Sequence, residues 1–252
     1  MFLLDVLIDR DVLFNARIKI YPNDIYKYTV FNKLIFNPFN AEPINKINNR
    51  VDFIKSDNPV TRDDSIKRAK DKIFDIAFSN SDLWQYFITL TLDKSKIDRY
   101  DKKIINKKLR VWLQNMVRDY NFNYLIIPEY HKDGAIHFHG LISGDGLRLS
   151  YVGYDKKGRE LYNFLSWKLG FSSCIKLDDN RMAVSSYITK YVTKDTSKIL
   201  GNVYYAGGHS LVRSCPAEYC NIDFGEFQGR EFDIPNTKIK VKYSIVVGCS
   251  DE

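Results

Sequence analysis

The chain has 252 residues, enough for one large domain with extensions and a sizeable core. Lysine and arginine (38) outnumber aspartate and glutamate (31), and the net charge of +7 favours a polyanionic partner without specifying one. No stretch approaches the roughly 18 apolar residues of a membrane span, and no Gly-rich loop ending in Gly-Lys-Ser/Thr marks a fused ATP-driven helicase.

The cysteines and the first residues bear on the compartment. Four cysteines occur without a Cys-x-x-Cys pair, which favours reduced thiols. The first apolar run is too short for a signal peptide. We therefore expect a soluble cytoplasmic protein without a membrane partner.

The first half of the chain changes from irregular to periodic sequence. Residues 1–60 contain short apolar runs without helical period and predict irregular structure with some strand. A helix then follows Thr61, which forms a capping-box pattern with Asp64. Its lysines and arginine favour a solvated face over a DNA contact. From Trp84 a period of two predicts a half-buried strand, and an apolar stripe predicts a helix over 101–120.

The second half predicts mostly strands. Two strands, at about 123–131 and 135–143, flank the turn signal Lys-Asp-Gly at 132–134. After a polar segment rich in Gly and Tyr, we expect a strand at 171–177 and a helix at 181–195, and residues 238–247 alternate like one more strand. This order of elements suggests an antiparallel α+β sandwich.

Three of the four histidines, His131, His137 and His139, fall within nine residues. Side chains alternate along a strand, so His137 and His139 point one way while Ile136 and Phe138 point into the core. Two neighbouring imidazoles form half of a metal site.

The length of the turn decides whether an acidic residue joins them. A three-residue loop with Gly134 in the left-handed position pairs Glu129 with His137, on the same face. A two-residue loop would place Glu129 opposite Phe138, unless a bulge restored the register. In either register His131 shares the face of Glu129. It would then be either an additional metal ligand or a residue that hydrogen-bonds to a ligand.

Two histidines and one carboxylate leave open positions for substrate oxygens. This set suits Mg²⁺ or Mn²⁺ acting as a Lewis acid. The simpler alternative to a metal site is that these histidines lie on the strand surface and bind no metal.

The predicted helix at 181–195 carries the second constellation. Tyr187 and Tyr191 are four residues apart and share one face of this helix. Lys190 and Lys194 are also four residues apart and share the adjacent face. A tyrosine can attack a phosphodiester and hold the cut end covalently, with help from a cation. Two interfacial tyrosines and two solvated lysines are the structural alternative.

The chain resembles the HUH endonucleases in three motifs and in their order. These motifs are the strand at 87–93, then Glu129 with the His-Phe-His of 137–139, and then the segment 187–194. More narrowly, the chain resembles rolling-circle replication initiators of small circular single-stranded DNA phages and plasmids. Residues 68–91 also resemble gene II type replication-associated proteins. The matched region is 61–195, and motif order favours an initiator because conjugative relaxases place the tyrosine before the histidine pair.

The resemblance implies a ferredoxin-like core: a five-stranded antiparallel sheet with helices mainly on one face. It implies domain boundaries at 1–60 (extension), 61–195 (endonuclease) and 196–252 (extension packed on the core). It implies that Glu129, His137 and His139 bind the metal, that Tyr187 and Tyr191 are nucleophiles, and that Lys190 and Lys194 belong to their helix.

The implied activity is nicking of origin DNA to a 5′-phosphotyrosine and a free 3′-hydroxyl, with later strand joining. We expect single-stranded origin DNA, host helicase and host polymerase as partners in the host cytoplasm. A single-stranded-DNA transposase or relaxase of the same superfamily, and a non-catalytic DNA-binding regulator, are the alternatives. A cupin metal enzyme fails locally, because Ile-Ser-Gly stands at 142–144 where it needs a glutamate.

Overall fold

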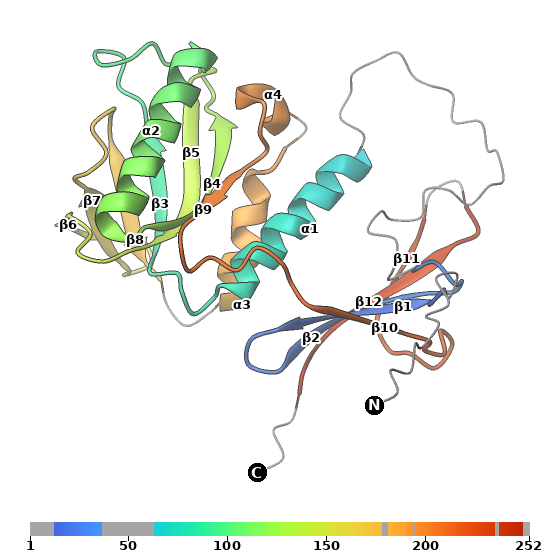
Figure 1. Ribbon diagram of the computed structural model, residues 1–252. Helices are drawn as coiled ribbons and strands as arrows, with labels where there is room; N and C mark the ends of the chain where they lie inside the picture. Colours follow the sequence, from blue (N-terminus) through green and yellow to red (C-terminus); the bar gives the residue numbers. More distant parts are fainter. Residues whose placement is uncertain (1–12, 37–62, 178–180, 194, 235–236, 249–252) are drawn as a thin grey trace, which may run out of the picture. The chain divides into compact units, whose positions relative to one another are not determined.

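The computed structural model describes residues 13–36, 63–177, 181–193, 195–234 and 237–248 (Figure 1). The chain forms two compact units, one of residues 59–214 and one that joins residues 1–58 to residues 215–252. The first unit therefore contains the whole expected 61–195 domain and continues to 214. The capping residue Thr61 lies outside the described residues.

The unit formed by the two ends of the chain is a five-stranded antiparallel sheet in the order β10-β1-β2-β12-β11. Strand β2 is its centre, because Ala16 of β1 pairs with Val30 on one side and Lys242 of β12 pairs with Val30 on the other. The expected strand at 238–247 is thus present as β12. The strands are β1 (Ala16–Tyr21), β2 (Ile25–Phe31), β10 (Ala217–Cys220), β11 (Arg230–Asp233) and β12 (Lys240–Val247).

The unit of residues 59–214 contains a seven-stranded antiparallel sheet in the order β6-β7-β8-β3-β5-β4-β9. Its strands are β3 (Tyr86–Thr91), β4 (Asn123–Tyr130), β5 (Ile136–Ser143), β6 (Leu149–Tyr154), β7 (Glu160–Phe164), β8 (Ser172–Lys176) and β9 (Tyr205–Gly207). Its helices are α1 (Asp63–Ser79), α2 (Lys102–Tyr120), α3 (Arg181–Ile188), the 3₁₀ turn η1 (Thr189–Tyr191) and α4 (Thr196–Leu200).

Alternation along the central strands fills two apolar cores, one on each face of this sheet. On one face Phe138 and Leu90 pack with α2 and α4. On the other face Phe87 and Leu141 pack with α1 and α3, and Figure 1 shows α2 on the side away from α1 and α3. The α+β class and antiparallel sheet are confirmed, but the sheet has seven strands and helices cover both faces.

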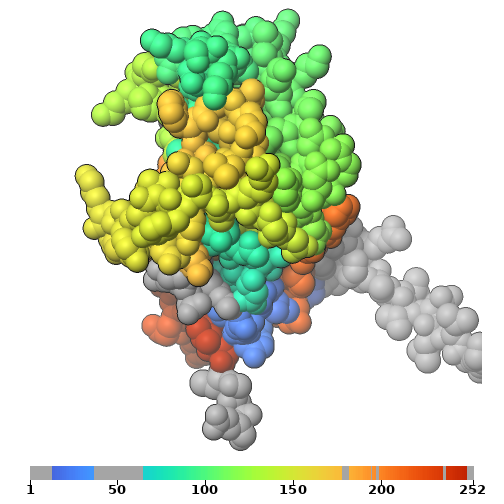
Figure 2. All heavy atoms as spheres, turned by 90° about the vertical axis from the view of Figure 1, so that its left-hand side faces the viewer, coloured from blue at the N-terminus to red at the C-terminus, as the bar shows by residue number. Residues whose placement is uncertain are grey.

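Three strands of this sheet, β6, β7 and β9, were not predicted from the sequence. Strands β6 and β7 come from the polar segment for which no structure was expected. They pair with a register shift between Tyr151 and Gly153, and this bulge interrupts the period of two that marks a strand. Figure 2 looks onto this side, where the yellow-green hairpin covers much of the surface.

Helix α2 shows how local chemistry fixes an element beside the site. Asp101 caps its first turn, because its carboxylate accepts hydrogen bonds from the backbone N–H groups of Lys103 and Ile104 at 2.9 and 3.0 Å. Asn121 ends it in the left-handed conformation, at φ 46°. Among the described helices of the chain, none is long and apolar enough to cross a membrane.

Candidate active site

The turn between β4 and β5 is the three-residue loop 132–134. The N–H of His131 donates to the carbonyl of Ala135 at 2.8 Å, and Gly134 takes a φ of +81°, which glycine adopts without strain. The resulting register pairs Glu129 with His137 and Pro128 with Phe138. Glu129 therefore shares the face of the histidine pair, and the two-residue alternative is not the one observed.

His139 has a polar partner at each ring nitrogen. Its Nε2 lies 3.0 Å from Glu129 Oε2, and its Nδ1 lies 3.1 Å from the hydroxyl of Thr89 on β3. This pairing follows from the sheet, since Thr89 stands directly opposite His139. The ring is thereby held with Nε2 toward the carboxylate.

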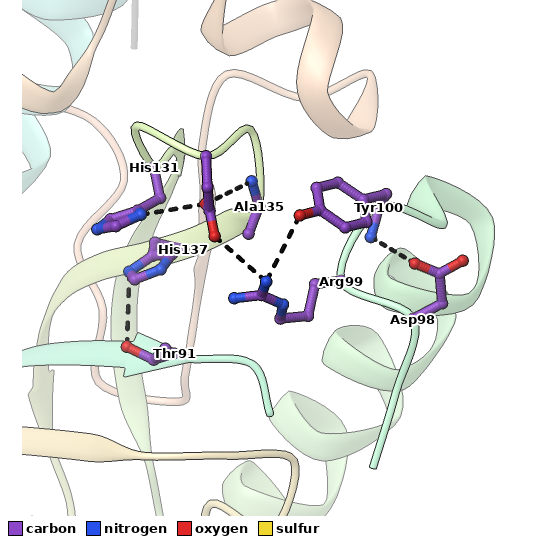
Figure 3. A network of polar contacts seen from close by, with 8 residues as sticks. Thr91, Asp98, Arg99, Tyr100, His131, Ala135 and His137 are labelled. Atoms are coloured by element: carbon purple, nitrogen blue, oxygen red, sulfur yellow. Dashed lines mark hydrogen bonds and ion pairs between the residues drawn. The ribbon is translucent and has the colours of Figure 1, made fainter. Parts of the chain in front are cut away.

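His137 repeats part of this arrangement. Its Nδ1 lies 3.5 Å from the hydroxyl of Thr91, and its ring stacks on that of His131 with 4.5 Å between centroids. His131 in turn contacts Asp133 at 3.1 Å, and Asp133 pairs with Arg99 at 3.2 Å (Figure 3). His131 thus belongs to a polar network beside His137.

These side chains have donor types that suit a divalent cation, namely two imidazoles and a carboxylate. Glu129 and His139 are already in contact, whereas the ring of His137 stacks on His131. In the described part of the chain, no three His, Cys, Asp or Glu side chains are gathered closely enough to hold an ion.

Burial controls the charge of the central pair. It lowers the pKa of His139 to about 4, and the positive charge of neighbouring His137 adds to this effect. Burial also raises the pKa of Glu129 above its usual value. The 3.0 Å contact at neutral pH is therefore a hydrogen bond between a neutral imidazole and a carboxyl group rather than an ion pair.

This burial predicts an unusual titration. In the metal-free protein we expect the ring protons of His139 to titrate near pH 4, measured by NMR and assigned with His139→Gln. Because its folded pKa lies below the unfolded value, the stability that His139 contributes is present above about pH 6.5 and is lost as pH falls toward 4. A midpoint near 6.5 would contradict this account of its environment.

The two tyrosines occupy a shorter helical segment than expected. Helix α3 ends at Ile188, Tyr191 ends the 3₁₀ turn η1, and Val192 is extended, so the segment is not one helix over 181–195. The tyrosines nevertheless meet, since the hydroxyl of Tyr191 donates to that of Tyr187 at 2.8 Å.

Tyr191 brings this segment onto the histidine face. Its ring stacks on His139 with 3.8 Å between centroids and 17° between planes. Phe87 of β3 lies against both tyrosines and His139, at centroid distances of 5.4 to 6.2 Å. Histidines and tyrosines some fifty residues apart in sequence therefore form one cluster.

The tyrosines differ in environment. Tyr187 is 43% exposed, whereas Tyr191 is partly buried. Burial, the hydrogen bond to Tyr187 and the charge of Glu129 raise the pKa of Tyr191 well above its usual value. Tyr191 is thus a protonated donor, and Tyr187 is the more accessible hydroxyl.

Of the two expected lysines, Lys190 lies at the tyrosines. Its Nζ is 5.2 Å from the centroid of the Tyr187 ring. Lys194 lies outside the described residues.

Sequence reasoning did not single out Thr89, Thr91 or Phe87 as residues of the site. All three belong to β3, the strand that the sequence predicts from Trp84, and the period of two puts them on one face. What the sequence alone did not show was that β3 lies beside β5, with Thr89 and Thr91 opposite His139 and His137.

The described geometry defines an α+β domain in which a histidine pair faces two tyrosines. Residues 85–196 match the model of a family of replication-associated proteins, those of the ORF2 and gene II protein type. The matched stretch is a little under half of the chain, and the match agrees with the resemblance seen in the sequence. Comparisons with curated proteins and with solved structures gave no match.

Proposed function

We propose that the protein initiates rolling-circle replication by nicking single-stranded origin DNA through a tyrosine. The observation that carries this proposal is the stacking of Tyr191 on His139, which puts both tyrosine hydroxyls beside the Glu129 and His139 pair. The match of residues 85–196 to replication-associated proteins supports the same proposal.

In the proposed reaction, Tyr187 Oη attacks the scissile phosphorus. The Oη–P bond forms, the bond from phosphorus to the 3′ oxygen breaks, and the 5′ end remains on the tyrosine. Solvent takes the phenolic proton, and the departing 3′ oxygen takes a proton from solvent. Host helicase would open the duplex, and host polymerase would extend the free 3′-hydroxyl.

Tyr187 is the better candidate for the first attack. Its hydroxyl is the more exposed, and it accepts the hydrogen bond from Tyr191, which would stabilise a phenolate forming on Tyr187. Lys190, whose Nζ lies over the ring, adds a positive charge. Tyr191 would then attack in the closing step, while Tyr187 still carries the old 5′ end.

Glu129, His137 and His139 would hold Mg²⁺ or Mn²⁺. Neutral imidazoles are the form that binds metal, and the hydroxyls of Thr89 and Thr91 lie at the two Nδ1 atoms, so each ring would bind through Nε2. The Nε2 of His139 would exchange its present contact with Glu129 for the cation. When bound there, the ion would supply Lewis-acid polarisation of the scissile phosphate.

Nicking of circular single-stranded DNA tests the proposed function. A pool of circles with random sequence is incubated with protein and Mg²⁺ or Mn²⁺, and linear products are resolved on a denaturing gel. We expect linear DNA with either ion and none in EDTA. Undiminished nicking in EDTA would contradict the metal role, and binding without nicking would favour a regulator.

A further inference from the structure

A second concave surface lies at the β9 edge of the seven-stranded sheet, apart from the histidine face. It is a cavity of about 680 Å³ between α1, α2 and the segment 201–206. Three cationic side chains line it, Lys72, Arg110 and Arg213, and its lining contains no carboxylate. We call it the β9-edge pocket.

Two of the cations, Arg110 and Lys72, contact uncharged partners. Arg110 Nε donates to Asn106 Oδ1 at 3.1 Å, and its guanidinium lies 5.6 Å from the centroid of the Tyr205 ring. Lys72 Nζ donates to the backbone carbonyl of Arg213 at 2.7 Å. None of these interactions neutralises a charge, so the pocket concentrates positive potential at one place.

Aromatic rings complete the lining. Tyr124 and Tyr204 line the pocket and are partly buried, and the charge of Arg213 acts on both phenol groups. Planar guanidinium groups suit phosphate oxygens, and tyrosine rings suit nucleobases by stacking. This combination matches a nucleotide unit.

The surface of α1 leads from the tyrosines toward this pocket. A second hollow, of about 630 Å³, is lined by Lys67, Lys70 and Asp71 of α1 together with Lys190, so three of its four charged side chains are cationic. Since Lys190 lies over Tyr187, cationic side chains continue from the tyrosines to one side of α1, and Lys72 of the same helix lines the β9-edge pocket.

We propose that the β9-edge pocket binds a nucleotide of single-stranded DNA, phosphate on the arginines and base on the tyrosines, and anchors the strand away from the cleavage site. The proposal rests on the proposed function for its ligand. In this proposal the single strand follows the surface of α1 from the cleavage site to the β9-edge pocket. The sequence alone did not favour a DNA contact for α1.

The test measures binding of single-stranded DNA to the full chain by fluorescence anisotropy in EDTA, which prevents cleavage. Oligonucleotides of about 4 and about 16 nucleotides are compared, the range that single-strand-binding modules cover. The variant is Arg110→Gln with Arg213→Gln. Arg118→Gln is the matched control, because Arg118 also lies on α2 but pairs with Asp119 at 2.6 Å.

We expect the double variant to bind the long oligonucleotide at least about tenfold more weakly than wild type, with the short one unaffected. The salt dependence of its affinity should fall by about 0.7 in log–log slope for each phosphate that the variant no longer binds. Arg118→Gln should behave like wild type. Replacing both arginines with lysine keeps the positive charge but loses the planar guanidinium groups, so this variant should bind more tightly than the glutamine variant and more weakly than wild type.

Three results would overturn the proposal, and they are distinguishable. If the double variant binds like Arg118→Gln, the pocket takes no DNA, while the proposed function stands. If a free deoxynucleoside monophosphate binds wild type as tightly as the long oligonucleotide, with the same arginine dependence, the ligand is a free nucleotide. If wild type binds neither oligonucleotide, the proposed function fails as well.

Discussion

Replacing His139 with alanine is expected to lower the rate of single-strand cleavage by more than about 100-fold. The proposed ion contributes several kcal/mol of charge stabilisation, and each 1.36 kcal/mol is a factor of ten in rate. His139 contacts Glu129, Thr89 and Tyr191, so its loss would remove a proposed ligand together with the surface on which Tyr191 stacks. The rate is measured with labelled oligonucleotide in single-turnover conditions.

The hydroxyl of Thr89 gives a graded control for this prediction. Thr89→Val keeps the shape but loses the partner of His139 Nδ1, and groups of this kind change metal affinity by about 10- to 100-fold. Thr89→Ser keeps the hydroxyl and should bind Mn²⁺ like wild type. Equal Mn²⁺ affinity in the valine variant, or full cleavage by His139→Ala, would contradict the proposed site.

The second large effect concerns the nucleophiles. Tyr187→Phe is expected to lose the first cleavage by at least about 10³-fold, because the attacking oxygen is absent. Tyr191→Phe should still cleave, more slowly, since Tyr187 loses one hydrogen-bond donor. It should fail to close DNA circles over repeated rounds, because the second hydroxyl is missing.

Covalent adducts on denaturing gels measure the first cleavage, and strand joining over several rounds measures the closing of DNA circles. The folded state should change little in either variant, and thermal melting checks this. If Tyr191→Phe abolishes the adduct while Tyr187→Phe cleaves and joins normally, the assignment of the first nucleophile is wrong. If one variant is normal in both functions, only one tyrosine is a nucleophile.

The histidine face could be predicted from the sequence because its geometry is local. A period of two puts His137 and His139 on one side of β5, and one glycine in a three-residue turn sets their register against Glu129. The cap of α2 at Asp101 is equally local. In such places a few neighbouring residues determine the backbone.

Other parts depend on long-range pairing that the sequence does not display. Val30 of β2 pairs with Lys242 of β12, more than 200 residues away, so the joining of the two ends into one sheet has no local signal. The bulge at Tyr151 hides strand β6. Helical period also predicted a continuous helix through Tyr191, whereas the 3₁₀ turn η1 brings Tyr191 onto His139.

Capture of the covalent adduct tests directly whether a tyrosine holds the cut 5′ end. Single-stranded DNA labelled at its 3′ end is incubated with protein and Mn²⁺, denatured, and digested for mass spectrometry of the labelled peptide. We expect a labelled protein band whose nucleotide is attached to Tyr187. Cleaved DNA without any protein adduct, or an adduct on a residue other than Tyr187 and Tyr191, would contradict it.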